Sequence, residues 1–151
     1  MAIKPEYKEN LTPIQEKYRK FWSVFNHISA NDVNFSGSFK VHPIPSIRYY
    51  QDYAVRKPYH ICIKISFDKE QYAIQAYFNN LVVYEEFYTR YRERIESMIG
   101  KQLQWKEMCT SAYAQLNVEP SLLISEEHNW DVLCQEIMPY AIKMKNVFGC
   151  F

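Results

Sequence analysis

One amphipathic segment, Asn79–Trp105, constrains the fold of this chain more than any other. Between residues 84 and 99, apolar and aromatic side chains recur at helical spacing, and an asparagine at the start can cap the helix. Gly100 follows where a helix commonly ends in the left-handed conformation. Leu103 and Trp105 then alternate with polar residues, as in a strand. The segment predicts a long helix that packs on a core and leads directly into a sheet.

Two further helices are predicted near the ends of the chain. In the first, residues 12–29, Thr12 can cap the helix and Gln15 can complete a capping box. Aromatic side chains then recur at helical spacing. The last helix is expected from near residue 125 to residue 148, with Pro139 kinking or dividing it.

Strict alternation marks the clearest strand, residues 59–67. Its odd positions are apolar, and its even positions are His60, Cys62, Lys64 and Ser66. Residues 72–78 alternate in the same way after a short connection, which predicts an antiparallel hairpin with one covered face. Segments 47–54 and 102–116 are expected to add strands, and segment 30–46, which contains two prolines, is expected to be a loop with short edge pieces.

The predicted order is therefore α-β-β-β-α-β-(β)-α. It indicates an α+β fold, with an antiparallel sheet of about four to five strands and three helices packed mainly on one face. At 151 residues the chain is expected to form one domain, 12–151, after a loose N-terminal segment, 1–11. Trp22 and Trp105 are expected to be buried in one core with the alternating isoleucines of residues 61–65 and with Ile95.

Composition excludes several function classes. The net charge of +1 provides no global field for nucleic acid or an anionic membrane, so binding to either would need a local patch. The four cysteines are widely spaced, the N-terminus lacks an apolar signal run, and no stretch approaches the length of a membrane span. These features predict reduced thiols, a cytoplasmic protein, no membrane association and no cofactor.

The richest polar and aromatic stretch is residues 47–59, in which four tyrosines and three cations interleave. Stacking rings and phosphate-neutralising cations are what single-stranded nucleic acid binding needs. The candidate binding residues are Arg48, Tyr50, Tyr53, Arg56 and Lys57. On a strand, Arg48 and Tyr50 would share one face, and Tyr49 and Tyr53 the other. The alternative is an ordinary strand whose tyrosines border the core.

Catalytic and metal-binding patterns are weak, so no catalytic residue and no metal ligand is predicted. A magnesium-dependent nuclease needs an acid, one intervening residue and a lysine on a strand, and Gln104-Trp105-Lys106 has the spacing without the anionic ligand. The sequence Glu6-Tyr7-Lys8 precedes the predicted structure. His60 and Cys62 share a strand face and could ligate zinc together, but a zinc site needs two more ligands.

The stretch Arg94-Ile95-Glu96-Ser97-Met98-Ile99-Gly100-Lys101-Gln102-Leu103-Gln104-Trp105 resembles the helix-to-strand signature of a bacterial domain-of-unknown-function family, of the DUF 4268 type. The resemblance extends over most of residues 12–148. Family members also occur joined to restriction-endonuclease-like domains. The resemblance therefore implies an association with DNA processing or bacterial defence, and this chain is expected to be a free-standing version.

Three hypotheses for the function follow. The leading one is a non-catalytic accessory or recognition domain that binds single-stranded nucleic acid or a protein partner. The first alternative is a metal-dependent hydrolase or nuclease-like enzyme. The second is a structural homodimer module that uses an uncovered sheet face or edge.

Overall fold

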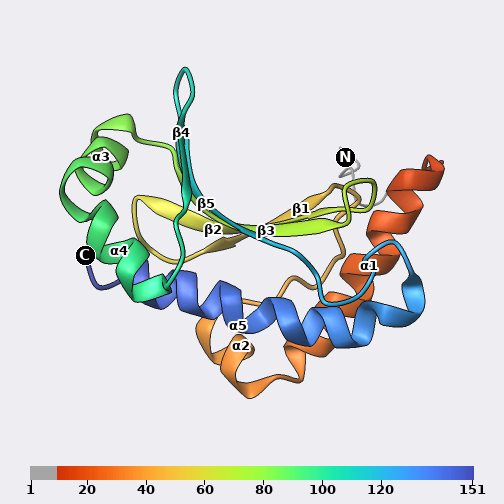
Figure 1. Ribbon diagram of the computed structural model, residues 1–151. Coiled ribbons are helices and arrows are strands. Elements are labelled where there is room, and N and C mark those ends of the chain that lie inside the picture. Colours follow the sequence, from red (N-terminus) through yellow and green to blue (C-terminus); the bar gives the residue numbers. More distant parts are fainter. Residues whose placement is uncertain (1–9) are drawn as a thin grey trace.

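The computed structural model, which describes residues 10–151, shows an α+β fold in which five antiparallel strands form one sheet. The strand order is β1-β2-β3-β5-β4. The long helix α5 runs beneath the sheet, with α1 and α2 on the same side (Figure 1). The elements are α1 (Pro13–Ala30), α2 (Val33–Ser38), β1 (Tyr50–Ala54), β2 (Tyr59–Ser66), β3 (Gln71–Phe78), α3 (Leu81–Glu86), the π-helical turn η2 (Phe87–Tyr91), α4 (Arg92–Ile99), β4 (Gln104–Glu107), β5 (Ala112–Val118), the 3₁₀ turn η3 (Glu127–Asn129) and α5 (Trp130–Phe148).

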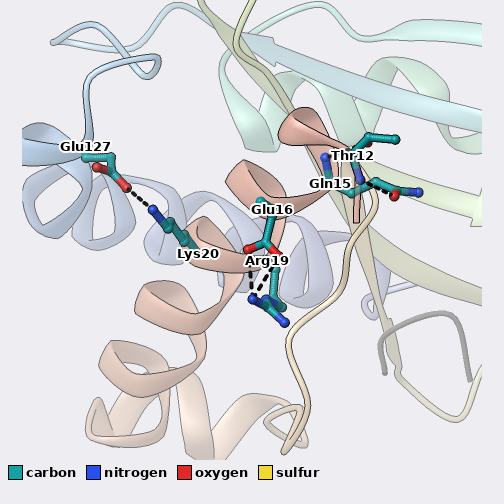
Figure 2. A network of polar contacts seen from close by, with 6 residues as sticks. All are labelled: Thr12, Gln15, Glu16, Arg19, Lys20 and Glu127. Carbon is teal, nitrogen blue, oxygen red and sulfur yellow. Dashed lines mark hydrogen bonds and ion pairs between the residues drawn. The ribbon is translucent and has the colours of Figure 1, made fainter. Parts of the chain in front are cut away.

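Helix α1 begins with the predicted capping box. The backbone N–H of Gln15 donates to the Thr12 hydroxyl at 3.3 Å, and the backbone N–H of Thr12 donates to the Gln15 side chain at 3.0 Å (Figure 2). Further along the helix, Lys20 lies 4.0 Å from Glu127, in the turn before α5. Because both side chains of this ion pair are exposed, it contributes little to stability.

The expected loop at residues 30–46 contains a short helix instead, which corrects the prediction. The Asp32 carboxylate accepts from the backbone N–H of Phe35 at 2.8 Å, and this N-cap starts α2. Phe35 is fully buried against α1 and β1, where it contacts Phe25 and Tyr53. Burial of this one ring stabilises a helix that is too short to show periodicity.

The register of the sheet confirms the predicted alternation. The side chains that face the helices are almost all apolar and buried; from β2 they are Tyr59, Ile61, Ile63 and Ile65, and from β3 they are Tyr72, Ile74, Ala76 and Phe78. Strand β5 continues this face with Ala112, Ala114, Leu116 and Val118. Ala112 and Ala114 are small and lie opposite Phe78 and Ala76. They leave room for the rings of Tyr84 from α3 and Phe148 from α5, which pack against Phe78.

The predicted helix 79–99 is present, with a π-helical turn at its middle. Asn80 caps it through hydrogen bonds from the backbone N–H groups of Val82 and Val83. Gly100 ends it with φ of 86°, the left-handed conformation that glycine adopts without steric cost. One oxygen of Glu96 then accepts from the backbone N–H of Leu103 at 2.7 Å and from the Trp105 indole at 3.2 Å.

Two other glutamates fix loops in the same manner. Glu70, at the turn between β2 and β3, accepts from the backbone N–H groups of Ile124 and Ser125 at 2.7 and 3.3 Å. Glu136 on α5 accepts from the Tyr72 hydroxyl at 2.7 Å and from the backbone N–H of Ser121 at 3.2 Å. Segment 119–129, which leads from the sheet to α5, is therefore held at two points.

Helix α5 begins later in the chain than predicted, and of the two effects expected of Pro139, division of the helix does not occur. It begins at Trp130 rather than near residue 125, because the Trp130 indole donates to the carbonyl of Ile124 at 2.7 Å and the chain turns over it. It also stays a single helix through Pro139. Ile137 and Ala141, on either side of the proline, are fully buried, and this packing offsets the hydrogen bond that proline cannot donate.

The two tryptophans expected in the core have different environments. Trp22 is fully buried, and its indole donates to the carbonyl of Arg48 at 2.8 Å. Trp105 packs on the core but is only partly buried, because β4 is the edge of the sheet. The expected burial of Trp105 in the core is therefore only partial, and that of Trp22 is confirmed.

Candidate binding surface on the open face of the sheet

The sheet has a second face, across which no helix lies among the residues that the structure describes (Figure 1). We call it the open face. Its side chains are polar, small or aromatic: Tyr50, Asp52 and Ala54 of β1; His60, Cys62, Lys64 and Ser66 of β2; Gln71, Ala73, Gln75 and Tyr77 of β3; Tyr113, Gln115 and Asn117 of β5; and Gln104 and Lys106 of β4. Within residues 10–151, this polar face is therefore left open by the helices and could contact a ligand.

A groove of about 540 Å³ crosses the middle of the open face. Cys62 and Gln75, which are paired across β2 and β3, are each 4% exposed and form its floor. Tyr50 borders the groove on β1, and Tyr77 and Tyr113 border it on β3 and β5. The volume lies in the range of pockets that hold small ligands.

A chain of polar contacts runs along one side of the groove. His60 Nε2 lies 3.2 Å from the Asp52 carboxylate, and its ring stacks on Tyr77 at a centroid distance of 5.1 Å. The Tyr77 hydroxyl is 2.8 Å from the hydroxyl of Ser111, in the turn that connects β4 to β5. These contacts fix the orientation of the imidazole and of the tyrosine ring.

Side-chain amides form a second chain across β3, β5 and β4. Gln75 donates to Gln115 at 2.7 Å, Gln115 donates to Asn117 at 2.6 Å, and Asn117 donates to Gln104 at 3.4 Å. The ammonium of Lys64 extends over the small Ala73 and donates to Gln115 at 3.4 Å. The amides therefore hold the position of a lysine at the centre of the face.

Lys64 also lies between two tyrosine rings. Its ammonium is 5.8 Å from the ring centroid of Tyr49 and 5.9 Å from that of Tyr113. Tyr49 in turn meets Tyr50 edge to face at 4.9 Å. A cation held against aromatic faces keeps its charge while its conformational freedom is reduced.

Two titratable groups in the groove have altered acidity. Burial alone would raise the pKa of Asp52, but hydrogen bonds from His60 and Cys62 and the nearby imidazoles lower it below its ordinary value. Burial, together with the Asp52 carboxylate, raises the pKa of the Cys62 thiol well above its ordinary value. The carboxylate is therefore ionised at neutral pH, and the thiol is protonated.

Four of the five predicted binding residues are accessible, but they do not form one patch. Tyr50 lines the groove, and Arg48 is exposed at a neighbouring hollow of about 290 Å³ beside Tyr50 and Asp52. Arg56 and Lys57 are exposed in the turn between β1 and β2, where Arg56 has a positive φ of 55°. Tyr50 is thus the predicted residue that the structure brings to the groove, and Arg48 lies in the hollow beside it.

Tyr53 is buried and does not belong to the binding surface, which corrects the prediction for this residue. Its side chain is 2% exposed, packs against Phe35 and Phe39, and accepts a hydrogen bond from Gln51 at 2.8 Å. Tyr49 also does not share the face of Tyr53, because it precedes β1 and its ring turns toward Lys64. The sequence alternation was therefore read correctly for β1 itself and wrongly for the residue before it.

Most residues of the groove were not among the predicted binding residues. Lys64, Gln75, Tyr77 and Tyr113 come from three strands, and no local segment contains them all. The available signal was the polar half of each alternating strand, which marks side chains that do not enter the core. Combining those halves requires the strand order.

The metal and nuclease alternatives gain no ligand set from the structure. Within residues 10–151, no three histidine, cysteine or acidic side chains are grouped as they would be to hold a metal ion. Gln104 and Lys106 lie on the open face of β4, where Gln104 accepts from Asn117. Residues 6–8 lie outside the described residues, as does most of the segment 1–11 that was expected to be loose.

One further structural finding concerns membranes: across residues 10–151, none of the helices combines the length and apolar character that crossing a bilayer requires.

Comparisons with known proteins give one match. The model of a family described as "Domain of unknown function (DUF4268)" matches residues 17–150, which include every strand and nearly every helical residue. Searches of curated proteins and of solved structures found no match.

Proposed function

The chain belongs to the DUF4268 domain family, and from this premise we propose that it is a non-catalytic recognition domain whose open face binds single-stranded nucleic acid. The observation that carries the proposal is the groove, in which tyrosines border a lysine held at its centre. The resemblance to proteins joined to nuclease-like domains suggests the setting, which is bacterial DNA processing or defence.

The aromatic side chains supply the first requirement of such binding. Single-stranded bases stack on aromatic rings, and each stack contributes roughly 1–3 kcal/mol whatever the base. Tyr50, Tyr77 and Tyr113 are partly exposed on three different strands. Sheet faces that carry aromatic residues on adjacent strands are an established way to stack successive bases.

Cations supply the second requirement, in modest number. Lys64 and Lys106 lie on the open face, and Arg48 lies at its edge. None of the three forms an ion pair within the described part of the chain. They are therefore available to phosphates, although a net charge of +1 provides little long-range steering.

The alternatives fit the geometry less well. The enzymatic alternative gains no nucleophile from Cys62, because a cysteine nucleophile must be a thiolate and the raised pKa of Cys62 opposes this form. A homodimer formed by edge-to-edge pairing needs a free strand edge. Both edge strands oppose such pairing. On β1, the imidazole of His42 already contacts the carbonyl of Asp52 at 2.6 Å, and β4 carries the exposed charges Lys106 and Glu107.

The test is a titration of labelled single-stranded DNA of mixed sequence at low and at moderate salt. We expect weak binding at low salt, and a decrease in affinity as salt rises that reflects a few phosphate contacts. Replacing Tyr113 by Ala should weaken binding about tenfold through the lost stack. The matched control is Tyr140→Ala, which removes a partly buried tyrosine from α5, on the other side of the sheet.

Absence of binding at low salt would reject the proposal, as would equal losses in Tyr113→Ala and Tyr140→Ala. In either case, a protein partner for the open face becomes the better hypothesis.

A further inference from the structure

Asp52 is the one carboxylate among the strand residues of the open face, and it lines the groove. It accepts from His60 at 3.2 Å, yet its side chain remains 49% exposed. A carboxylate can accept about four hydrogen bonds. Asp52 therefore keeps acceptor capacity that faces the groove rather than the protein.

A carboxylate at this position has consequences for how a nucleic acid could lie. The contacts of Asp52 favour its ionised form, and an anion repels the phosphates that Lys64 and Lys106 attract. A base edge, and not the backbone, must therefore face Asp52. A base edge satisfies a carboxylate only if it presents N–H donors.

Resting on the proposed function, we infer that Asp52 is a specificity-determining residue that favours guanine among the four bases. Guanine presents two adjacent donors on its Watson–Crick edge, the ring N1–H and the exocyclic amine, and these match the two oxygens of a carboxylate. Guanine O6, which is an acceptor, lies beside these two donors. The Lys64 ammonium, on the strand next to that of Asp52, is the charged donor that would pair with O6.

The other bases complement this set less well. Thymine places its single N–H between two carbonyl oxygens, so one carbonyl would face the carboxylate. Cytosine and adenine each present one amine next to an acceptor nitrogen. Since unstacked bases are recognised on their Watson–Crick edges in single strands, this difference can act as selectivity.

The experiment uses short labelled thymidine oligonucleotides that carry isolated guanines, inosines, cytosines or adenines, titrated into the full chain at low salt. We expect the guanine oligonucleotide to bind on the order of tenfold more tightly than thymidine alone. Inosine lacks the exocyclic amine and should lose most of that advantage. Asp52→Asn should remove the preference, and Asp131→Asn, an exposed carboxylate on α5, should retain it.

The outcomes separate the two proposals. Equal affinity for all four bases, or a guanine preference that survives in Asp52→Asn, would overturn the role of Asp52 and leave nucleic acid binding in place. No binding to any oligonucleotide would reject the proposed function itself. The comparison of guanine with inosine uses the unaltered protein, so it decides the question even if Asp52→Asn fails to fold.

Discussion

The two faces of the sheet carry similar polar and aromatic residue types, which have different roles on each face. On the helix-covered face, Gln51 exchanges hydrogen bonds with Asn26 at 2.9 and 3.3 Å and donates to the Tyr53 hydroxyl, so this polar set is closed. On the open face, tyrosines and amides also contact one another, but they border a groove. Residue type alone does not distinguish a structural tyrosine from a binding one; the face of the strand does.

The largest expected difference in stability is between substitutions at two residues of β3, one on each face of the sheet. Ile74 is fully buried on the covered face, and Ile74→Ala should lower the free energy of unfolding by about 2–5 kcal/mol through lost contacts and a cavity. Tyr77→Ala, on the open face, should cost about 1 kcal/mol through its stack and hydrogen bond. Urea denaturation of both variants measures the difference, and similar losses would contradict the contrast between the faces.

The next effect concerns the glutamate that joins α4 to β4. Glu96→Ala should lower the free energy of unfolding by about 2 kcal/mol, because a backbone N–H and an indole N–H lose a charged acceptor. Glu93→Ala, an exposed position on the same helix, should change it by less than about 0.5 kcal/mol. Denaturant midpoints compare the two, and an unchanged midpoint in Glu96→Ala would refute the contact's importance.

A third prediction uses the buried tyrosine of the covered face. Burial raises the pKa of Tyr53 far above its ordinary value, against a smaller opposing effect of the bond from Gln51. Its neutral form therefore stabilises the fold up to the unfolded pKa, about 10, and this contribution is lost as pH rises above it, by about 1.4 kcal/mol per pH unit.

Tyr53→Phe should be less stable than the unaltered chain at neutral pH, and the gap should close above pH of about 10. Stability curves measured by chemical denaturation at increasing pH test this. A gap that stays constant would show that Tyr53 ionises as readily in the folded chain as in the unfolded one.

The smallest effect is expected at acid pH from Asp52, on the open face. Its folded pKa is lowered, so the ionised form stabilises the fold above the unfolded pKa of about 3.9, and this contribution is lost as pH falls through the folded pKa. Because the side chain is half exposed, solvent screens the effect. Asp52→Asn should flatten the acid limb of the stability curve slightly, and an unaltered limb would contradict the pairing with His60.

Local signals predicted much of the fold. The capping box at Thr12, the left-handed Gly100 and the alternation of β2 and β3 each depend on residues close together in sequence, and each is confirmed. Helix α2 was missed because six residues are too few for a period. The groove was missed for a different reason: its residues meet only once the strand order is known.

The stretch on which the resemblance to the family was noticed, residues 94–105, has a structural role in this chain. Glu96, Gly100 and Trp105 make one joint, in which the helix ends and its last turn holds the start of β4. Such a joint preserves the geometry of the sheet edge without contacting a ligand. The residues that line the groove therefore lie outside this stretch.

The strand order also has a consequence for how the chain folds. Strands β1, β2 and β3 are consecutive hairpins, but β3 pairs with β5 across the 33 residues numbered 79–111. Bringing β3 and β5 together costs conformational entropy of this connection before their contacts can compensate for it. The cost is smaller if the helical segment has already formed. The first three strands are therefore expected to form early, and the groove, which needs Tyr113 beside Tyr77, is expected to appear only when β5 pairs with β3.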